Sequence, residues 1–447
     1  MKKHSPRIIG LRAIRKTSHV SKRVSQRVSG LLQKVENRTT RLIVSGTGSP
    51  DGSPSVNLSE LIHAHYPQVT PLHPALPLVG QRPSVTVFAF LDSRGFYGGI
   101  ATLLIVAASL AKKLDYDLRI VQTTGYSKTN TVIDYLNRND IDFPESRFST
   151  FDASKRSPFE FSYLPIHPDD VVMVSAWWDA QVASQLPLKK KFIYLIQDFE
   201  PIFYNNSDDY LFANQTYFSE KFVPICNTEL LYSFFKAKKY QYITDNAVWF
   251  EPAPAPKVKA KSPRRGDKKT LFLYGRPSVH RNLFFTALQA LDKAFSDPRL
   301  AGQIGEWQLF CAGQNDIPST RLSGGLTVKN LGKMSLDDYY SFASTVDVAL
   351  SPMLAPHPNY PTLELASLGS IVVSTKYETK QDLSRYSKNI LMAEPTIEDV
   401  ARKIIDAVLF DKKTREQNVE SNNIAGNWTV ALKQPIEDLA KKLSGQS

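Results

Sequence analysis

One acidic residue, Glu364, follows a proline-rich loop where the chain is expected to change from loop to helix. Residues 346–375 predict a buried strand, a loop with four prolines, a helix from near Thr362 to Gly369, and a second buried strand. Parallel α/β sheets bind ligands beyond the carboxyl ends of their strands, where helix N-termini offer unpaired N–H groups to phosphate. A carboxylate one turn into that helix could accept hydrogen bonds from a ribose diol. The stretch therefore predicts a nucleotide site.

Two cations follow another predicted strand, residues 270–275, in the sequence YGRPSVHRNLF. Arg276 and Arg281 lie between this strand and a predicted helix, so both should project near the carboxyl edge of the sheet. Fixed cations at this edge suit a diphosphate, because charge-assisted hydrogen bonds to phosphate are strong. His280 lies between them and could contribute, although a lone histidine in a loop is more often incidental.

The first half of the chain places two carboxylates after a strand. Asp198 and Glu200 follow the predicted strand 192–197 in the sequence YLIQDFEPIFY. At the mouth of a cleft, either carboxylate could orient an acceptor hydroxyl or act as a base. Asp198 suits equally well the cap of a neighbouring helix.

Aromatic and glycine pairs occupy two further strand ends. Trp177 and Trp178 could pack their rings on a sugar, although core packing is the commoner fate of aromatic residues. Gly98 and Gly99 open a predicted helix, where their backbone N–H groups could closely approach a ligand. Turn geometry alone also explains many adjacent glycines.

The sequence PHPNYPTLELASLG, residues 356–369, resembles the donor-nucleotide motif of GT-B glycosyltransferases. The resemblance is to the glycosyltransferase 4 group, and in particular to its WsaF-like rhamnosyltransferases. It implies that a nucleotide-sugar donor is bound by residues of this motif, namely Asn359, Tyr360, Thr362 and Glu364. The wider group has two glutamates separated by seven residues. Pro356 occupies the position of the first, so only Glu364 is present.

The resemblance covers residues 84–435 in overall plan and is specific in 194–204, 272–285 and 331–375. It implies that Arg276 and Arg281 hold the donor diphosphate, where the family usually has an Arg and a Lys. These two arginines and Asp198 are the expected catalytic residues, since the leaving diphosphate must be stabilised. The resemblance also implies that Lys333 contacts the donor, the alternative being an ordinary surface lysine, and that the Gly98–Gly99 loop faces the cleft.

Two sheets are needed to position these residues. Short buried strands alternate with helical segments from residue 84 and again from 269, which predicts two doubly wound, Rossmann-like parallel sheets. The resemblance implies a GT-B fold of class α/β, with the site in the cleft between two domains. The expected segments are a tail with its linker at 1–55, an acceptor-side domain at 56–252, a hinge at 253–268, a nucleotide-sugar-binding domain at 269–425, and a C-terminal helix at 426–447 that could cross back to the first domain.

The net charge of +12 is concentrated in residues 1–41, which hold twelve Lys or Arg and one acid. The rest of the chain has 43 basic and 42 acidic residues. Apolar residues recur in this tail at spacings of three and four, which predicts a basic amphipathic helix on an anionic membrane surface. A disordered arm, or a helix docked on the protein's own body, is the alternative.

Several absences in the sequence set the expected location. No stretch approaches the ~20 apolar residues that span a bilayer, and the N-terminus lacks the apolar region of a secretory signal. Cys226 and Cys311 lie far apart in strand-like contexts, which indicates core thiols rather than a disulfide or metal pair. We therefore expect a metal-free cytoplasmic protein, held peripherally at the inner face of the cytoplasmic membrane.

The expected activity is transfer of a sugar to a growing bacterial surface polysaccharide. The resemblance implies rhamnose as the sugar, dTDP-rhamnose as donor and co-substrate without any other cofactor, and a lipid-linked oligosaccharide or polysaccharide as acceptor. Two alternatives remain: a sugar-nucleotide enzyme of the same fold, such as an epimerase, and a nucleic-acid-binding protein, suggested by the pI of about 9.4. The near-neutral body has no basic stripe and no nucleic-acid-binding motif. The residues leave open the sugar, the base, the acceptor, the linkage, retention or inversion, the catalytic base and the oligomeric state.

Overall fold

The computed structural model describes residues 55–91, 96, 98–125, 131–254 and 268–445. The predicted tail helix within 1–41 and most of the predicted hinge therefore lie outside the described residues. The described residues separate into two compact units, one containing 55–70 with 157–160 and the other containing the described residues from 71 onward except 157–160. Both large sheets lie in the second unit.

The first unit contains one described α-helix. Helix α2 (Leu58–His65) is capped by Asn57, whose side chain accepts a hydrogen bond from the Glu60 N–H. The 3₁₀ helix η1 (Pro67–Val69) follows it, with a proline at its first position, where the missing N–H has no intrahelical partner to lose.

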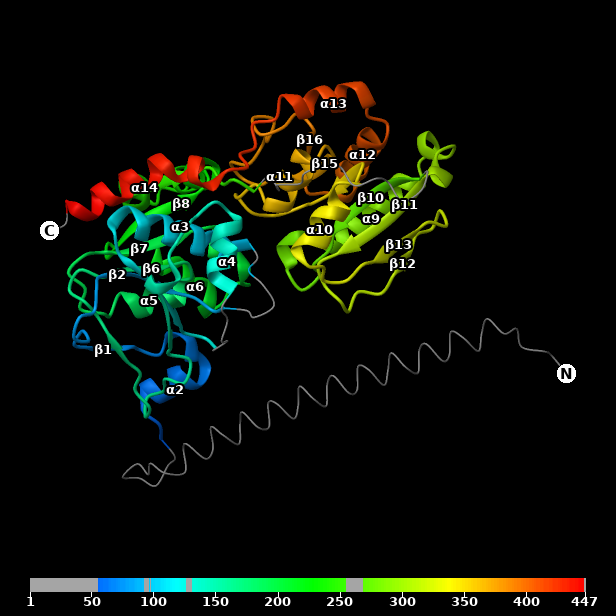
Figure 1. Cartoon of the computed structure of the whole chain (residues 1–447). Coiled ribbons are helices and arrows are strands. Elements are labelled where there is room, and N and C mark those ends of the chain that lie inside the picture. Colours follow the sequence, from blue (N-terminus) through cyan, green and yellow to red (C-terminus); the bar gives the residue numbers. More distant parts are fainter. Residues whose placement is uncertain (1–54, 92–95, 97, 126–130, 255–267, 446–447) are drawn as a thin grey trace. The chain divides into compact units, whose positions relative to one another are not determined.

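The first of two seven-stranded sheets in the second unit is parallel throughout, with strand order β4-β3-β2-β6-β7-β8-β9 (Figure 1). The order reverses between β2 and β6, which creates a crevice at the carboxyl ends of these two strands. The strands are β2 (Ser84–Phe88), β3 (Asp117–Gln122), β4 (Phe148–Asp152), β6 (Val171–Val174), β7 (Phe192–Ile196), β8 (Phe222–Asn227) and β9 (Val248–Phe250). The helices are α3 (Gly98–Leu114), α4 (Thr131–Arg138), α5 (Trp177–Ala183), α6 (Asp208–Thr216), α7 (Glu229–Ala237) and α8 (Gln241–Asn246).

The second sheet has the order β12-β13-β11-β10-β14-β15-β16 and is parallel except at the edge strand β12. Its order reverses between β10 and β14. The strands are β10 (Lys269–Tyr274), β11 (Trp307–Ala312), β12 (Thr320–Arg321), β13 (Thr327–Asn330), β14 (Val348–Leu350), β15 (Ile371–Thr375) and β16 (Ile390–Ala393). The helices are α9 (Phe284–Phe295), α10 (Leu336–Ala343), α11 (Tyr360–Ser367), α12 (Ile397–Val408) and α13 (Lys412–Glu420). The predicted α/β class with two doubly wound sheets is confirmed.

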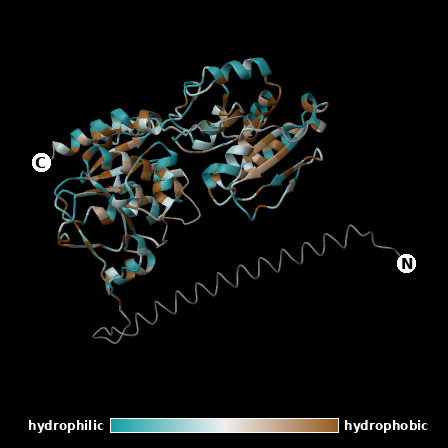
Figure 2. Ribbon diagram, in the orientation of Figure 1, coloured by the Kyte–Doolittle hydropathy of each residue, from teal (hydrophilic) through white to brown (hydrophobic). Residues whose placement is uncertain are grey.

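Apolar strands form the centre of each lobe, by which we mean a sheet with its covering helices (Figure 2). Every residue of β2, β7 and β8 is buried, as expected for central strands covered on both faces. The surface helix α13, in contrast, has no buried residue. Cys226 and Cys311 are free and buried, so the prediction of core thiols is confirmed.

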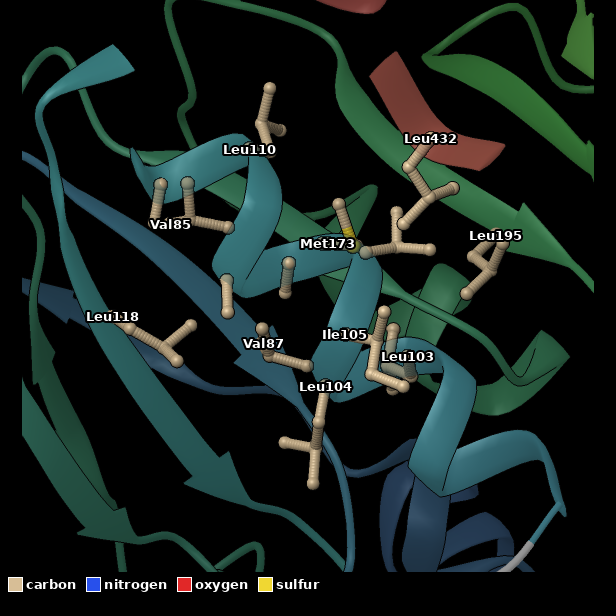
Figure 3. Close-up of a cluster of buried hydrophobic side chains, with 14 of the residues drawn as sticks. Val85, Val87, Leu103, Leu104, Ile105, Leu110, Leu118, Met173, Leu195 and Leu432 are labelled. Carbon is tan, nitrogen blue, oxygen red and sulfur yellow. The ribbon is translucent and has the colours of Figure 1, made fainter. Parts of the chain in front are cut away.

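The last helix, α14 (Trp428–Ser444), belongs to the core of the first lobe. Asn427 caps it by accepting a hydrogen bond from the Val430 N–H at 3.0 Å. Leu432 of α14 packs in one apolar cluster with Leu104 of α3 and Val87 of β2 (Figure 3). The chain thus returns to the first sheet after completing the second, through a helix that begins two residues after the predicted start at 426.

A small parallel ribbon lies apart from the two large sheets, formed by β1 (His73–Ala75) and β5 (Tyr163–Pro165). Strands β4, β9 and β16 and the helices α4, α6, α12 and α13 were not anticipated from the sequence. Within the described ranges, no helix is both long enough and apolar enough to cross a membrane.

Candidate functional site

A pocket of about 580 Å³ is lined from both sheets. It opens beside the carboxyl ends of β10 and β11 and the first turns of α3 and α11, as the strand reversals predict. From the first lobe it is lined by Phe96, Gly98, Ala101, Thr102, Tyr135, Arg138, Asn139, Ala253 and Pro254, and from the returning chain by Gly426 and Trp428. From the second lobe it is lined by Phe272, Tyr274, Arg276, Ala312, Gly313, Lys333, Met334, Ser335, Leu336, Asp337, Tyr339, Tyr340, Tyr360, Pro361 and Glu364.

Arg276 reaches the pocket from the turn that follows β10 and is exposed there. The neighbouring loop approaches this turn so closely that only glycine fits at position 313. A Cβ on Gly313 would lie 2.8 Å from the Gly275 carbonyl oxygen and 2.9 Å from Arg276 Cγ, and the φ of +130° is also one that other residues rarely adopt. The close approach fixes the base of the Arg276 side chain.

Glu364 is a buried carboxylate in the pocket lining, 9% exposed. Its Oε1 accepts a long hydrogen bond of 3.4 Å from the Tyr340 hydroxyl. Burial raises the pKa of Glu364 to about 7, and the Tyr339 and Tyr340 hydroxyls oppose this rise. A carboxylate removed from water with so little hydrogen bonding is ready to accept bonds from a ligand.

Tyr360 joins the helix that carries Glu364 to the first lobe. Its hydroxyl accepts a 2.7 Å hydrogen bond from Asn227 Nδ2 and shares another, of 2.9 Å, with Thr102 Oγ1. Thr102 in turn donates to the Gly98 carbonyl oxygen at the start of α3. The hydroxyl of Tyr360 therefore links helix α11 to helix α3 at the pocket.

The first turn of α3 contributes backbone rather than side chains. Gly98 has a φ of +50° and Gly99 lies against Gln197, whose Nε2 donates to the Gly99 carbonyl oxygen at 2.8 Å. No acidic residue lies in this first turn, so its N–H groups and the helix dipole favour an anion.

Lys333 is exposed at the pocket, and its backbone N–H donates to Asn315 Oδ1. Arg138 adds a third cation, which the sequence did not indicate.

Arg281 and Asp198 lie together, but outside the pocket lining. Arg281 Nε is 3.5 Å from Asp198 Oδ2, and the guanidinium lies 4.0 Å from the centre of the Phe203 ring. Burial raises the pKa of Asp198 to about 6, although Arg281 opposes this rise. Asp198 also accepts a hydrogen bond from the Phe199 N–H, the residue that precedes the 3₁₀ helix η3 (Glu200–Phe203). Asp198 is thus paired with a predicted site cation, and the alternative role as a helix cap is not seen, because the N-cap of η3 is Phe199 and no side-chain hydrogen bond caps this helix.

Glu200 and Trp177 lie in the core of the first lobe, not at a cleft mouth. Trp177 is 0% exposed, and its Nε1 donates to the Tyr204 hydroxyl at 2.9 Å. Glu200 accepts hydrogen bonds from the Tyr194 hydroxyl and from the Trp177 backbone N–H, so it caps α5. Trp178 is half-buried, edge-on to Trp177. The structure does not bring these three predicted acceptor residues into the pocket, because their strand-end positions face packed side chains.

The side chains of Asn359 and Thr362 do not line the pocket and instead contact the end of β14. Helix α11 begins at Tyr360, two residues earlier than predicted, because Asn359 takes a φ of +73° that turns the chain into the helix. Asn359 Nδ2 donates to Ser351 Oγ at 2.9 Å, and Thr362 Oγ1 lies 3.5 Å from the Ser351 carbonyl oxygen. These two side chains hold the proline-rich loop against the end of β14, and their proposed contact with the donor is not seen in the pocket lining.

The residues that sequence reasoning missed come from other elements. Tyr339 and Tyr340 lie on α10, and Tyr135 and Arg138 on α4. The doublet in SLDDYYSFAST was a usable signal, since two tyrosines on a short helix next to Lys333 are unusual for a surface helix. No comparable signal marks α4. Together, three cations, a helix N-terminus, the carboxylates of Glu364 and of the exposed Asp337, and an aromatic wall suit a ligand that combines a diphosphate, a hydroxylated sugar and a ring.

Solved structures share this fold over most of the chain. Sucrose-phosphate synthase from Thermosynechococcus elongatus has a TM-score of 0.56 at 14% identity, and covers 82% of this chain and 100% of that one. HepE from Anabaena, solved in complex with UDP and glucose, has a TM-score of 0.53 at 14% identity, covering 81% and 100%. WaaG, a glycosyltransferase involved in lipopolysaccharide biosynthesis, has a TM-score of 0.54 at 14% identity, covering 78% and 98%. These similarities, at 14% identity, show that the chain has the GT-B fold, with the pocket between two doubly wound sheets.

Sequence comparison identifies the family to which the chain belongs. The WsaF N-terminal domain family matches residues 87–229, and the WsaF C-terminal domain family matches residues 269–405. The two matches together cover more than half of the chain, and the chain is a WsaF-like GT-B glycosyltransferase. The O-antigen biosynthesis protein RfbC of Myxococcus xanthus is 31% identical over 256 residues, which are 57% of this chain and 19% of that protein. The match spans about a fifth of the length of this curated relative.

Proposed function

We propose that this protein transfers a sugar from a nucleotide-diphosphate sugar to a growing glycan. The observation that carries the proposal is the pocket in which Glu364, Arg276 and the start of α3 meet. Glu364 would accept a hydrogen bond from the 3′-hydroxyl of the donor's nucleoside, the one free sugar hydroxyl that the deoxyribose of dTDP offers. Arg276, Lys333 and the N-terminus of α3 would hold the diphosphate.

The same groups would act in the reaction as well as in binding. Breaking the bond between sugar and diphosphate leaves an additional negative charge on the β-phosphate, and fixed cations and helix N–H groups stabilise that charge most in the transition state. We propose that these cations replace a metal ion, so chelation by EDTA should leave turnover unchanged. Arg281 and Asp198 lie next to this site, and we propose Asp198 as the group that orients the acceptor hydroxyl.

The relatives support a particular donor and product for this proposal. Membership of the WsaF group supports rhamnose, delivered from dTDP-rhamnose, as the transferred sugar. The O-antigen biosynthesis protein of Myxococcus xanthus supports a bacterial surface polysaccharide as the product. We propose a lipid-linked oligosaccharide or polysaccharide as acceptor.

A membrane-bound acceptor requires the enzyme to work at the inner face of the cytoplasmic membrane. We propose that the basic residues 1–41 hold it there, since each Lys or Arg close to an anionic surface contributes about 1 kcal/mol. Sedimentation with anionic liposomes tests this step. The full-length chain should pellet, a chain that starts after Pro54 should not, and equal pelleting of the two would contradict the proposal.

Binding of the donor can be tested without knowing the acceptor. A thermal-shift screen with dTDP-rhamnose, dTDP-glucose, UDP-glucose, GDP-mannose and ADP-glucose should show a rise in melting temperature with the dTDP sugars, because a ligand that binds only the folded state stabilises it. Calorimetry should then give a smaller dissociation constant for dTDP-rhamnose than for the others. No stabilisation by any nucleotide sugar would contradict the proposed function, and stabilisation by another one alone would replace the donor.

A further inference from the structure

The small ribbon of β1 and β5 has one face in the core of the first lobe and the other towards solvent. Side chains alternate between the two faces along a strand. Leu164 of β5 is fully buried, in one apolar cluster with Leu72, the residue before β1. Its neighbour Tyr163 is exposed, and so is Phe161, just before β5. The buried leucines therefore anchor a ribbon that presents aromatic rings to solvent.

A tight turn follows β1 and presents three apolar side chains to water. Leu76 is 88% exposed, Leu78 is 67% exposed and Val79 is fully exposed. The Gln81 N–H donates to the Leu78 carbonyl oxygen at 3.0 Å, and the Leu78 N–H donates to Gln81 Oε1 at 3.0 Å. Gly80 supplies the φ of +77° that the third position of such a turn requires. The exposure of these side chains is thus a fixed feature of a closed turn.

The rings of the ribbon contact one another and adjoin the turn. The ring centre of His73, in β1, lies 4.4 Å from that of Phe161 and 5.9 Å from that of Tyr163. Ala75 pairs with Pro165 at the end of the ribbon, and the turn begins with the next residue. The exposed side chains of ribbon and turn form what we call the ribbon face: Leu76, Leu78, Val79, Phe161 and Tyr163.

The proposed sugar transfer does not account for the ribbon face. None of its five residues lines the pocket, and Figure 1 shows β1 at the margin of the first lobe, on the side opposite α14. The two segments that carry the face, 71–81 and 161–166, contain no Asp, Glu, Lys or Arg. Single exposed apolar residues are ordinary on protein surfaces, whereas a group of them indicates an interaction surface.

The chemistry of the ribbon face distinguishes among three possible occupants. The tail, residues 1–41, has a net charge of +11, and the two segments of the face offer it no carboxylate. A second copy of the chain requires about 800 Å² of complementary surface on each partner, whereas Leu78 and Val79 lie at the tip of a turn. A lipid bilayer accepts a projecting apolar turn among its headgroups, and it accepts tyrosine at the interface, where ring and hydroxyl are both accommodated.

The chain that leads from the basic tail to the ribbon is also apolar on its surface. Helix α2 lies between them in the sequence, and its side chains Leu58, Leu61 and Ile62 are exposed. Their spacing of three and four residues places them on one side of the helix. Cations of the tail attract anionic headgroups, so charge and apolar surface follow each other along the sequence.

We propose that the ribbon face inserts into the headgroup region of a phospholipid bilayer and orients the enzyme on the membrane. This inference goes beyond the proposed function, in which residues 1–41 alone bind the membrane, and it holds for any transferred sugar. The two contacts differ in their response to salt. Screening weakens the attraction between the tail and anionic lipids, whereas insertion of apolar side chains persists.

Sedimentation of the full-length chain with vesicles tests the ribbon face. The vesicles are phosphatidylcholine with about 30% phosphatidylglycerol, in about 1 M KCl, where the Debye length falls to about 3 Å. The combined variant Leu76→Ser, Leu78→Ser and Val79→Ser should bind about tenfold more weakly than wild type, since three apolar side chains no longer enter the bilayer. Unchanged binding of this variant would overturn the inference, and so would a wild-type chain that no longer binds at this salt concentration.

A matched variant controls for a general loss of surface hydrophobicity. Phe285→Ser, Leu409→Ser and Val430→Ser combined also removes three exposed apolar side chains, all outside the ribbon face. This variant should bind the vesicles as wild type does, and a loss as large as that of the ribbon variant would contradict a specific face. No nucleotide sugar is present in these measurements, so their failure is distinguishable from failure of the proposed sugar transfer, which the thermal-shift screen reports.

A fluorescent probe tests the same face if the combined variant does not fold. Cys226 and Cys311 are buried, so a single surface cysteine, Val79→Cys, can be labelled selectively with an environment-sensitive dye. Its emission should move to shorter wavelength when the vesicles are added, and that of the same dye on Leu409→Cys should not. Vesicle-bound protein with no shift at position 79 would overturn the inference. A dye at position 79 that is shielded without vesicles would overturn it too, in favour of the tail, or of a second copy if shielding rises with protein concentration.

Discussion

Glu364 and Glu200 are two buried glutamates, one in each lobe, and they differ in the hydrogen bonds that their carboxylates accept. Burial raises the pKa of each to about 7. Glu200 accepts hydrogen bonds from the Tyr194 hydroxyl and the Trp177 N–H, both inside its own lobe. Glu364 has the long hydrogen bond from Tyr340 and lines the pocket.

The difference teaches that burial and a raised pKa do not by themselves mark a binding residue. Both carboxylates lie where a doubly wound fold exposes strand ends, and both are desolvated. Hydrogen bonding separates them, because a satisfied carboxylate stabilises the fold and an unsatisfied one is available to a ligand. Five experiments can break or sharpen this comparison.

The largest effect should be on stability, and only at Glu200. Glu200→Ala leaves two buried donors without an acceptor, and each costs about 1–3 kcal/mol, so the free energy of unfolding should fall by about 3 kcal/mol. Glu364→Ala should change it by less than about 1 kcal/mol, because it removes a desolvated charge and one weak hydrogen bond. Unfolding in urea, followed by circular dichroism, measures both. Equal destabilisation would remove the distinction between the two glutamates.

Arg276 should show the next largest effect, on turnover. Removal of one group that stabilises developing charge typically lowers kcat by a factor of about 100 or more, with a smaller change in KM. Arg276→Ala should behave in this way in a steady-state assay of sugar transfer. Arg299→Ala is the matched control, since Arg299 is exposed and pairs with Asp297 two residues away. A preserved kcat with a raised KM would mean that Arg276 only binds.

Donor affinity should depend on Glu364 and not on Glu200. Loss of hydrogen bonds to the charged Glu364 side chain typically costs about 1.5 kcal/mol or more, so Glu364→Ala should bind dTDP-rhamnose at least about tenfold more weakly. Glu200→Gln, measured at a temperature at which it is folded, should bind as wild type does. Calorimetry decides, and an unchanged dissociation constant in Glu364→Ala would remove Glu364 from the site.

The smallest effect should appear in the dependence of binding on pH. Because burial raises the pKa of Glu364 to about 7, the free protein increasingly protonates this side chain below neutrality. Binding that requires the carboxylate should therefore weaken as pH falls, by roughly eightfold from pH 7.5 to 6.0. A nucleotide sugar is the right probe, because its diphosphate does not titrate in this range. Glu364→Gln should bind with an affinity that does not change over the same interval, which separates the titration of Glu364 from that of Asp198, whose pKa is also raised.

The same raised pKa affects stability in the opposite sense. Between pH 4.5 and 7 the folded protein holds protons on Glu364 and Glu200 that the unfolded chain has released. Each group therefore reduces stability as pH rises through this window. Glu364→Gln should make the free protein less sensitive to pH there, measurable as a smaller change of melting temperature.

The sequence predicted a residue's place correctly where the succession of neighbouring elements alone determines it. A strand, a loop and a helix in succession place Arg276 and Glu364 at the carboxyl edge of one sheet, and the structure brings both to the pocket together with Lys333 and Gly98. Most of the strands and the long helices α3 and α9 follow from apolar periodicity, which depends on neighbours in the chain.

The sequence did not predict a residue's place where that place depends on a hydrogen-bond partner far away in the chain. Glu200 and Trp177 occupy strand ends as Glu364 does, and only the folded chain shows that each satisfies the other, 23 residues apart. The contact of Tyr360 with Thr102 joins residues 258 positions apart, and no local pattern encodes it. The start of α11 was predicted two residues late because the φ of Asn359 depends on the His357 ring that accepts its N–H.

The return of α14 to the first sheet has a consequence for how the protein is made. The core of the first lobe includes Leu432, Ile436 and Leu439, which the ribosome delivers only after the whole second lobe. Domains usually fold during synthesis in the order in which they emerge. Here the lobe that is translated first cannot complete its core until the last helix is released, so the nascent chain exposes an apolar groove on α3 and β9 throughout translation of the second lobe.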